Sequence, residues 1–287
     1  MHFFDKLSAP FITLSRQSLE SFIRLETVDD SVTVVAEDGS LVTYIRVDGS
    51  RQMIGPEEYQ YLIETSTVKI GSRFDRPGHA LQIYFARNPE RIHLEMDPLV
   101  KPSQNTAAAI GLEMEDLFEE RRRHLAKYLN WEDMFFVLWT RPNILSKAEL
   151  DRAVKAQQAK EWVPAANAQH PFAAMEALRN RHKSYVNGIV SALDELGIRG
   201  SVLEVHEALR EVRNNLFPKK ANKDWKPCLP GDNIPVRAPD NKVDHSEVLW
   251  PPLREQIATE RSRIISDEVI QIGSTLWGSV DITLAPM

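Results

Sequence analysis

The chain has 287 residues, of which 43% are hydrophobic and 26% are charged, and its net charge is −6. This length allows two average domains or one large one, and the acidic balance argues against nonspecific nucleic-acid binding over the whole surface. Cys228 is the only cysteine, which excludes an intrachain disulfide and a cysteine-based zinc site, and no apolar run is long enough to predict a membrane-spanning helix.

The first 26 residues form a predicted N-terminal arm that is rich in apolar side chains. After Pro10, the residues Leu19, Phe22 and Ile23 follow the spacing of one helix face. Such a segment either packs on the body of the protein or docks on a partner or a membrane surface. Its candidate docking side chains are Phe3, Phe4, Leu7 and Phe11.

Residues 27–145 are predicted to form an α+β domain. Asp38-Gly39 lies between two runs of β-branched residues and is typical of a hairpin turn. Pro56 suits the first turn of a helix, where a missing N–H costs nothing. The expected elements are strands near 32–35 and 41–47, a helix over 56–70, a strand over 79–87, a long helix over 106–130 and a strand over 131–140. This order predicts an antiparallel or mixed sheet with helices on one face.

The second half is predicted to be mostly helical. A helical subdomain is expected over 146–217, and a turn containing Gly197 and Gly200 joins its last two helices into a hairpin. Residues 218–252 are rich in proline and lack periodicity, which is typical of a long loop or linker. Residues 253–287 are expected to add a short helix and a strand that returns to the sheet.

The sequence contains no recognised catalytic motif. A phosphate loop requires a Gly-Lys pair, and none occurs. His206-Glu207 begins like the helix of a zinc protease, but Arg210 stands where the second histidine would be needed. We therefore predict that this segment has no catalytic residue, no cofactor and no metal site.

A run of basic residues lies inside the predicted helix over 106–130. Arg121, Arg122 and Arg123 follow several acidic residues, and Glu119 stands three and four positions before Arg122 and Arg123. This spacing favours ion pairs on a solvated helix face. The alternative interpretation is a docking site for an anionic partner.

Three short segments, in this order and at this spacing, resemble the N-terminal domain of the type IV secretion and conjugation ATPases. Leu41–Gly49 (LVTYIRVDG) resembles the opening strand, which ends in Asp-Gly before a helix. Ile83–Glu90 (IYFARNPE) and Met134–Pro142 (MFFVLWTRP) resemble the two strands that follow. The best subgroup match is the IcmB/DotO-type ATPase of the Dot/Icm secretion system with its TraU-like relatives, and the resemblance covers about residues 27–145.

The resemblance implies a non-catalytic domain for assembly and docking. In this family a downstream domain carries the phosphate loop and binds ATP and Mg²⁺, so the chain is expected to be part of a longer ATPase. The implied partners are other ATPase subunits and inner-membrane subunits of the secretion system, with self-association in the full-length protein. The implied location is cytoplasmic and peripheral to the bacterial inner membrane.

Three other interpretations stay open at the level of sequence. The chain could be a cytosolic adaptor that is complete in itself, or an enzyme whose site the sequence does not reveal. A nucleic-acid-binding module would need a continuous basic stripe with exposed aromatic residues, and the acidic balance speaks against it.

Overall fold

A computed structural model describes residues 19, 23–74, 77–88, 91–129, 131–158, 175–229, 232, 251–266 and 268–278. Its strands are β1 (Leu25–Val28), β2 (Val34–Ala36), β3 (Leu41–Ser50), β4 (His79–Asn88), β5 (Trp131–Thr140), β6 (Ile198–Val202), β7 (Ser262–Ile264), β8 (Val269–Ile272) and β9 (Thr275–Gly278). Its α-helices are α2 (Pro56–Gly71), α3 (Arg91–Ala109), α4 (Glu115–Leu125), α5 (Lys147–Gln158), α6 (Glu176–Glu195), α7 (Val205–Leu216) and α8 (Leu253–Ile257). Short 3-10 helices cover Ser72–Phe74, Pro142–Ile144 and Pro218–Lys220.

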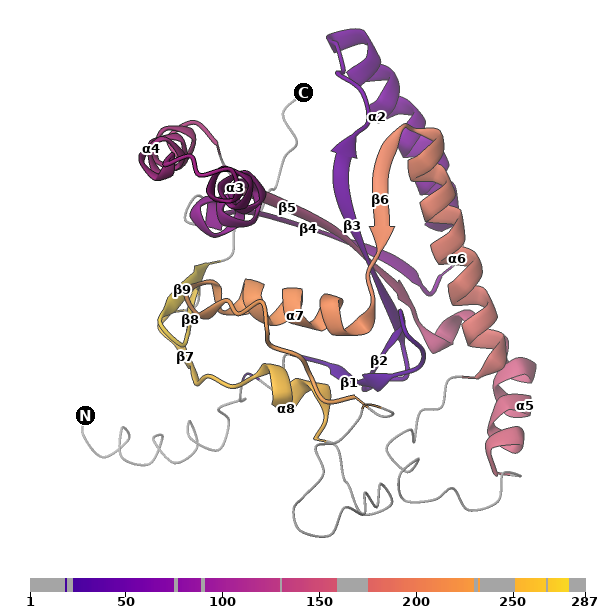
Figure 1. The fold of residues 1–287 in the computed structure, drawn as a ribbon. Helices are drawn as coiled ribbons and strands as arrows, with labels where there is room; N and C mark the ends of the chain where they lie inside the picture. The colour runs from indigo at the N-terminus through magenta and orange to yellow at the C-terminus, as the bar shows by residue number, and fades with distance from the viewer. Residues whose placement is uncertain are drawn as a thin grey trace, which may run out of the picture.

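The main sheet is antiparallel and has the strand order β1-β2-β3-β5-β4, with β6 also paired to β3 (Figure 1). The longest ladder joins β4 to β5 from the pair His79–Thr140 to the pair Asn88–Trp131. The predicted hairpin forms between β2 and β3, where Gly39 has a φ of 78° that L-residues rarely adopt. The predicted α+β class is therefore confirmed, with an antiparallel sheet.

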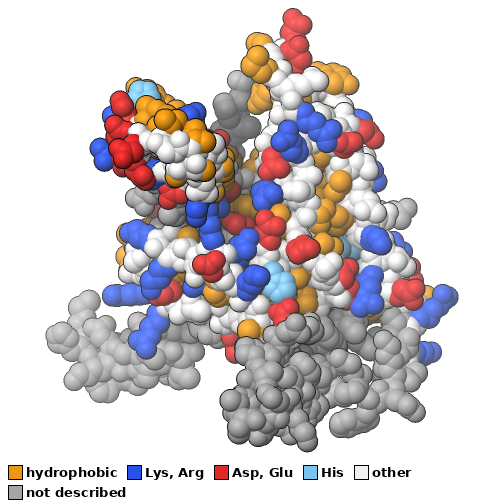
Figure 2. All heavy atoms as spheres, viewed as in Figure 1, with side chains coloured by type: hydrophobic (Ala, Val, Ile, Leu, Met, Phe, Trp, Pro, Cys, Tyr) orange, Lys and Arg blue, Asp and Glu red, His pale blue; other side chains and the backbone are white. Residues whose placement is uncertain are grey.

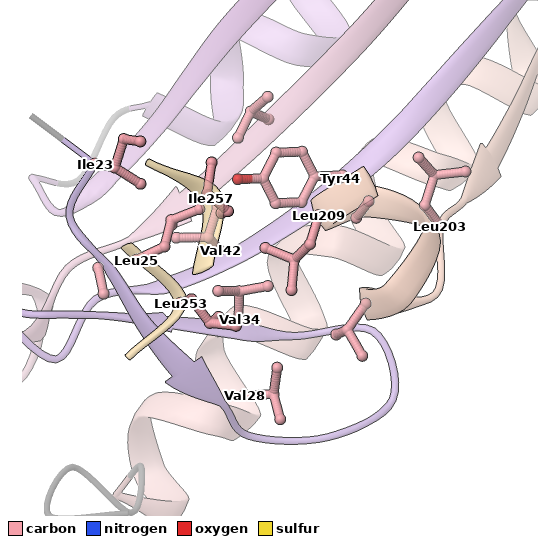
Figure 3. Packing of buried hydrophobic residues seen from close by; sticks show 14 of the residues in the cluster. Ile23, Leu25, Val28, Val34, Val42, Tyr44, Leu203, Leu209, Leu253 and Ile257 are labelled. Atoms are coloured by element: carbon pink, nitrogen blue, oxygen red, sulfur yellow. The ribbon is translucent and has the colours of Figure 1, made fainter. Parts of the chain in front are cut away.

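Helices cover both faces of the sheet, so the prediction that they lie on one face is wrong. Side chains of β3 alternate between the two faces, as the period of a strand requires. Val42 and Tyr44 pack in a core with α7 and α8, whereas Ile45 packs against Tyr185 and Ile189 of α6. Figure 3 shows the core on the α7 side, where Leu209 and Ile257 lie among residues of the strands.

The expected long helix over 106–130 is two helices, α3 and α4. Gly111 follows α3 with a φ of 72°, and its N–H donates to the carbonyl oxygen of Ala108, which closes the end of the helix. The first half of α3 was not predicted, because Pro98 and Pro102 lie inside it and proline normally disfavours a helix interior.

The C-terminal half also differs from the predicted arrangement. β6 lies between α6 and α7 and pairs with β3, so these two helices do not form a hairpin. β7, β8 and β9 form a separate three-stranded sheet and do not return to the main sheet. The described part of the proline-rich segment, residues 218–229, 232 and 251–252, packs against α7 through Trp225 and Leu229. None of the helices in the described ranges has the length and apolarity that crossing a membrane requires.

Candidate functional site

Helices α3 and α4 lie side by side at one end of the sheet, away from α6, and we call residues 91–129 the helical arm (Figure 1). The arm has a small core of its own, which is formed by Val100, Ala107 and Phe118 with Met114 packed against it. Arg122 joins the two helices, because its guanidinium lies 3.3 Å from the carboxylate of Asp97.

The arm exposes many large apolar side chains. Figure 2 shows hydrophobic side chains gathered on the visible side of this lobe, at the upper left of the view. The exposed fractions reach 75% for Leu99 and 72% for Tyr128, and the set is Leu99, Ile110, Leu112, Leu117, Tyr128 and Leu129. Exposed apolar residues are ordinary when they are scattered, but six within a unit of two helices are typical of an interaction surface.

A group of largely buried charges fixes the base of the arm to the body of the protein. Arg91, the first residue of α3, donates to Asp133 of β5 at 2.6 Å and to Glu95 at 3.2 Å. Its guanidinium also lies 3.5 Å from the carboxylate of Glu211 on α7 and 5.2 Å from the ring centroid of Trp131. Arg91 thus ties α3 to a strand and to a helix of the α7-side core.

The pKa values of Arg91 and Glu211 are both raised, which favours the charged form of Arg91 and the neutral form of Glu211. Burial lowers the pKa of Arg91, but the carboxylates of Asp133, Glu211 and Glu95 outweigh burial and raise it. Burial raises the pKa of Glu211 against the attraction of Arg91. The group can hold the arm in place, but it presents no nucleophile beside a base, and we assign it a positioning role.

The predicted basic run lies on α4, and most of it is engaged locally. Glu119 lies 3.1 Å from Arg123 and 3.5 Å from Arg122, which confirms the two ion pairs that the spacing predicted. Arg121 is exposed and has no ion pair with any described residue. Of the predicted docking residues, therefore, Arg121 is the available cation, and it lies on the arm four positions after the exposed Leu117. Phe3, Phe4, Leu7 and Phe11 lie outside the described residues.

Helix α2 presents a second apolar surface. It has no buried residue, and its exposed apolar side chains include Tyr59, Tyr61, Ile63 and Val68. Tyr59 and Ile63 have the spacing of a buried helix face, but they are 58% and 41% exposed. The helix contacts α6 instead through a narrow stripe that includes the half-buried Ile70.

A chain of polar contacts crosses the α6-side core. The Thr43 hydroxyl donates to the carbonyl oxygen of Val32 at 3.2 Å and lies 2.8 Å from His182 Nε2. The Thr140 hydroxyl lies 2.8 Å from His182 Nδ1 and 3.1 Å from His79 Nδ1. Each hydroxyl has one proton. Thr43 therefore accepts from His182 Nε2, Thr140 donates to His182 Nδ1, and His79 Nδ1 donates to Thr140.

This chain of contacts keeps both histidines neutral. Burial lowers the pKa of His182 to about 4, although the nearby carboxylates of Asp30 and Asp29 act in the opposite direction. Burial also lowers the pKa of His79, whose ring stacks on Tyr185 with centroids 4.1 Å apart. Because both nitrogens of His182 are occupied by hydroxyl groups of the core, we assign it a structural role.

Within the described ranges, no group of three or more His, Cys, Asp or Glu side chains is placed to hold a metal ion. His206 instead pairs with Asp232 at 3.0 Å, and Asp232 also accepts from the backbone N–H of Leu229. This contact fastens the described start of the proline-rich segment to α7. No protein-family model matches the chain, and no curated protein matches it.

Proposed function

We propose that the chain is a non-catalytic assembly and docking domain of a type IV secretion ATPase of the IcmB/DotO and TraU-like group. The three segments that resemble this family fall on β3, β4 and β5, which are adjacent in the main sheet. In this proposal the domain attaches the motor to inner-membrane subunits of the secretion system from the cytoplasmic side. ATP and Mg²⁺ bind to a downstream domain of the parent protein.

The observation that carries this proposal is the helical arm. Its base is held in place by Arg91, and its surface carries six exposed apolar side chains. A surface that is already held in place loses less conformational entropy when a partner binds. Large apolar and aromatic side chains such as Leu117 and Tyr128 are the residue types that supply most of the affinity in protein interfaces, whereas charges at the rim supply less.

The experiment is a recruitment assay with the full-length parent protein in its source cells. The double variant Leu117→Asp/Tyr128→Asp changes two side chains that are 51% and 72% exposed, so the fold should be unaffected. We expect at least a tenfold loss of co-purification with inner-membrane subunits, because each anchor contributes about 1–2 kcal/mol or more.

The matched control is Ile264→Asp on β7, which is 70% exposed and lies outside the arm. It should leave co-purification unchanged. Normal recruitment of the double variant would contradict the arm as the docking surface.

A further inference from the structure

A cavity of about 380 Å³ lies on the α7 face of the sheet, away from the exposed surface of the arm. It is bounded by strands β3, β4 and β5, by α7 and by β9. Five aromatic side chains line it: Tyr44, Tyr84, Phe135, Trp139 and Trp277. This volume falls in the range of small-molecule sites.

Water fills such a cavity poorly. A volume of this size has room for roughly a dozen water molecules at their share of liquid volume. Each water needs polar partners, and the walls are largely aromatic and aliphatic, with Val137 and Leu203 beside the rings. An apolar ligand that displaces this water therefore gains affinity.

Tyr44 is the polar side chain of the cavity lining that bears most directly on which ligand fits. Tyr44 is only 7% exposed, and its hydroxyl forms no hydrogen bond there, while burial raises its pKa. Figure 3 shows this hydroxyl pointing toward the side of the cluster where Ile257 and Ile23 lie. Glu211 Oε2 and Trp277 Nε1 also lack hydrogen bonds to described residues, but neither atom has surface that a water-sized molecule can reach, so a ligand in the cavity does not contact them. Buried polar groups are normally paired, and each exception requires an explanation.

We propose that this cavity binds a small neutral aromatic molecule that carries a hydrogen-bond acceptor. The aromatic walls favour a planar ring, which can stack on or pack edge-on against the side chains of Tyr84 and Trp139. The acceptor takes the hydroxyl proton of Tyr44.

The charges of the lining favour a neutral ligand over an ion. Glu211 already has Arg91 as its counter-ion at 3.5 Å, so an added charge inside the cavity would be buried without a full partner, which is costly. Arg24, the other charged residue of the described lining, is exposed to solvent. This inference does not depend on the proposed docking function.

The test uses benzamide, which has an aromatic ring, a carbonyl acceptor and N–H donors, with the 287-residue chain followed by ¹H–¹⁵N NMR. We expect saturable shifts at cavity residues with a dissociation constant in the millimolar range, as is typical of a fragment of this size. Tyr44→Phe removes one hydrogen bond and should weaken binding about fivefold. Cyclohexanecarboxamide, which keeps the amide but lacks the ring, and benzoate, which is charged, should bind at least threefold more weakly.

Val212→Trp fills the cavity from α7 and should abolish the shifts, whereas Leu117→Ala on the arm should leave them unchanged. If Val212→Trp loses its fold, Leu216→Trp takes its place. The proposal is overturned if benzamide causes no saturable shifts, if it binds the cavity-filling variant as well as the original chain, or if cyclohexanecarboxamide binds as tightly.

Discussion

Acidification should destabilise the protein through His182. This side chain is 3% exposed, and its pKa is lowered from 6.5 to about 4 by burial. The folded state therefore prefers neutral His182, while the unfolded chain takes up a proton below pH 6.5. The stabilisation is complete above pH 6.5 and is lost as the pH falls toward 4, because the unfolded state binds more protons in this window.

The size of the effect follows from the shift in pKa. A shift of about 2.5 units corresponds to about 3 kcal/mol at ~1.36 kcal/mol per unit. Most of this loss, about 2.5 kcal/mol, should be reached at pH 4.5. Below pH 4 both states are protonated at this residue, and it causes no further loss.

Urea unfolding measured from pH 7.5 to pH 4.5 tests this prediction. The variant His182→Gln should be less stable than the original chain over this whole pH range, because Thr43 and Thr140 lose their hydrogen bonds to the imidazole ring. Between pH 7.5 and pH 4.5, however, its stability should fall by about 2–3 kcal/mol less than that of the original chain. The control His124→Gln changes an exposed histidine on α4 and should keep the pH dependence of the original chain. Equal pH dependence in His182→Gln and the original chain, or an NMR titration of His182 near pH 6.5, would refute the reasoning.

Three further predictions concern the helical arm and the N-terminal residues of the chain. Arg91→Met should destabilise the chain by about 3–5 kcal/mol in urea unfolding, because it takes their shared cation from the largely buried carboxylates of Asp133 and Glu211. Adding Glu211→Gln should recover part of this loss, and no recovery would argue against a role for charge. Gly111→Ala should cost about 1 kcal/mol by the same assay, since alanine resists a φ of 72°; an unchanged midpoint would contradict this. Deleting residues 1–14 should reduce recruitment of the parent ATPase to the membrane complex, and intact recruitment would rule out these residues as an anchor.

Much of the fold could be predicted because residues close in sequence mark where its helices and strands begin and end. The strand over 131–140 has the predicted bounds, since a continuous apolar run ends at Arg141-Pro142. Helix α2 begins at Pro56 as expected. By contrast, α3 carries two prolines in a helical conformation that tertiary contacts stabilise. β6 was not predicted because it contains Arg199 and Gly200, which do not favour a strand. It forms by pairing with β3, which is distant in sequence.

The candidate site was predictable only where its contacts are local. The ion pairs of Glu119 follow from helical spacing. The group around Arg91 combines residues from α3, β5 and α7, and no spacing in the sequence brings Asp133 and Glu211 together. The exposed side of the arm was missed for a related reason. An apolar residue at helical spacing predicts burial. Only the folded structure shows that the described elements around Leu117 leave it 51% exposed.

An immunoblot of fractionated source cells, with an antibody raised against this chain, tests the central claim most directly. It reports the size and the location of the natural protein together. The docking proposal predicts a band well above the mass of 287 residues, part of it in the inner-membrane fraction. A band at the mass of this chain alone, found only in the cytosolic fraction, would contradict it.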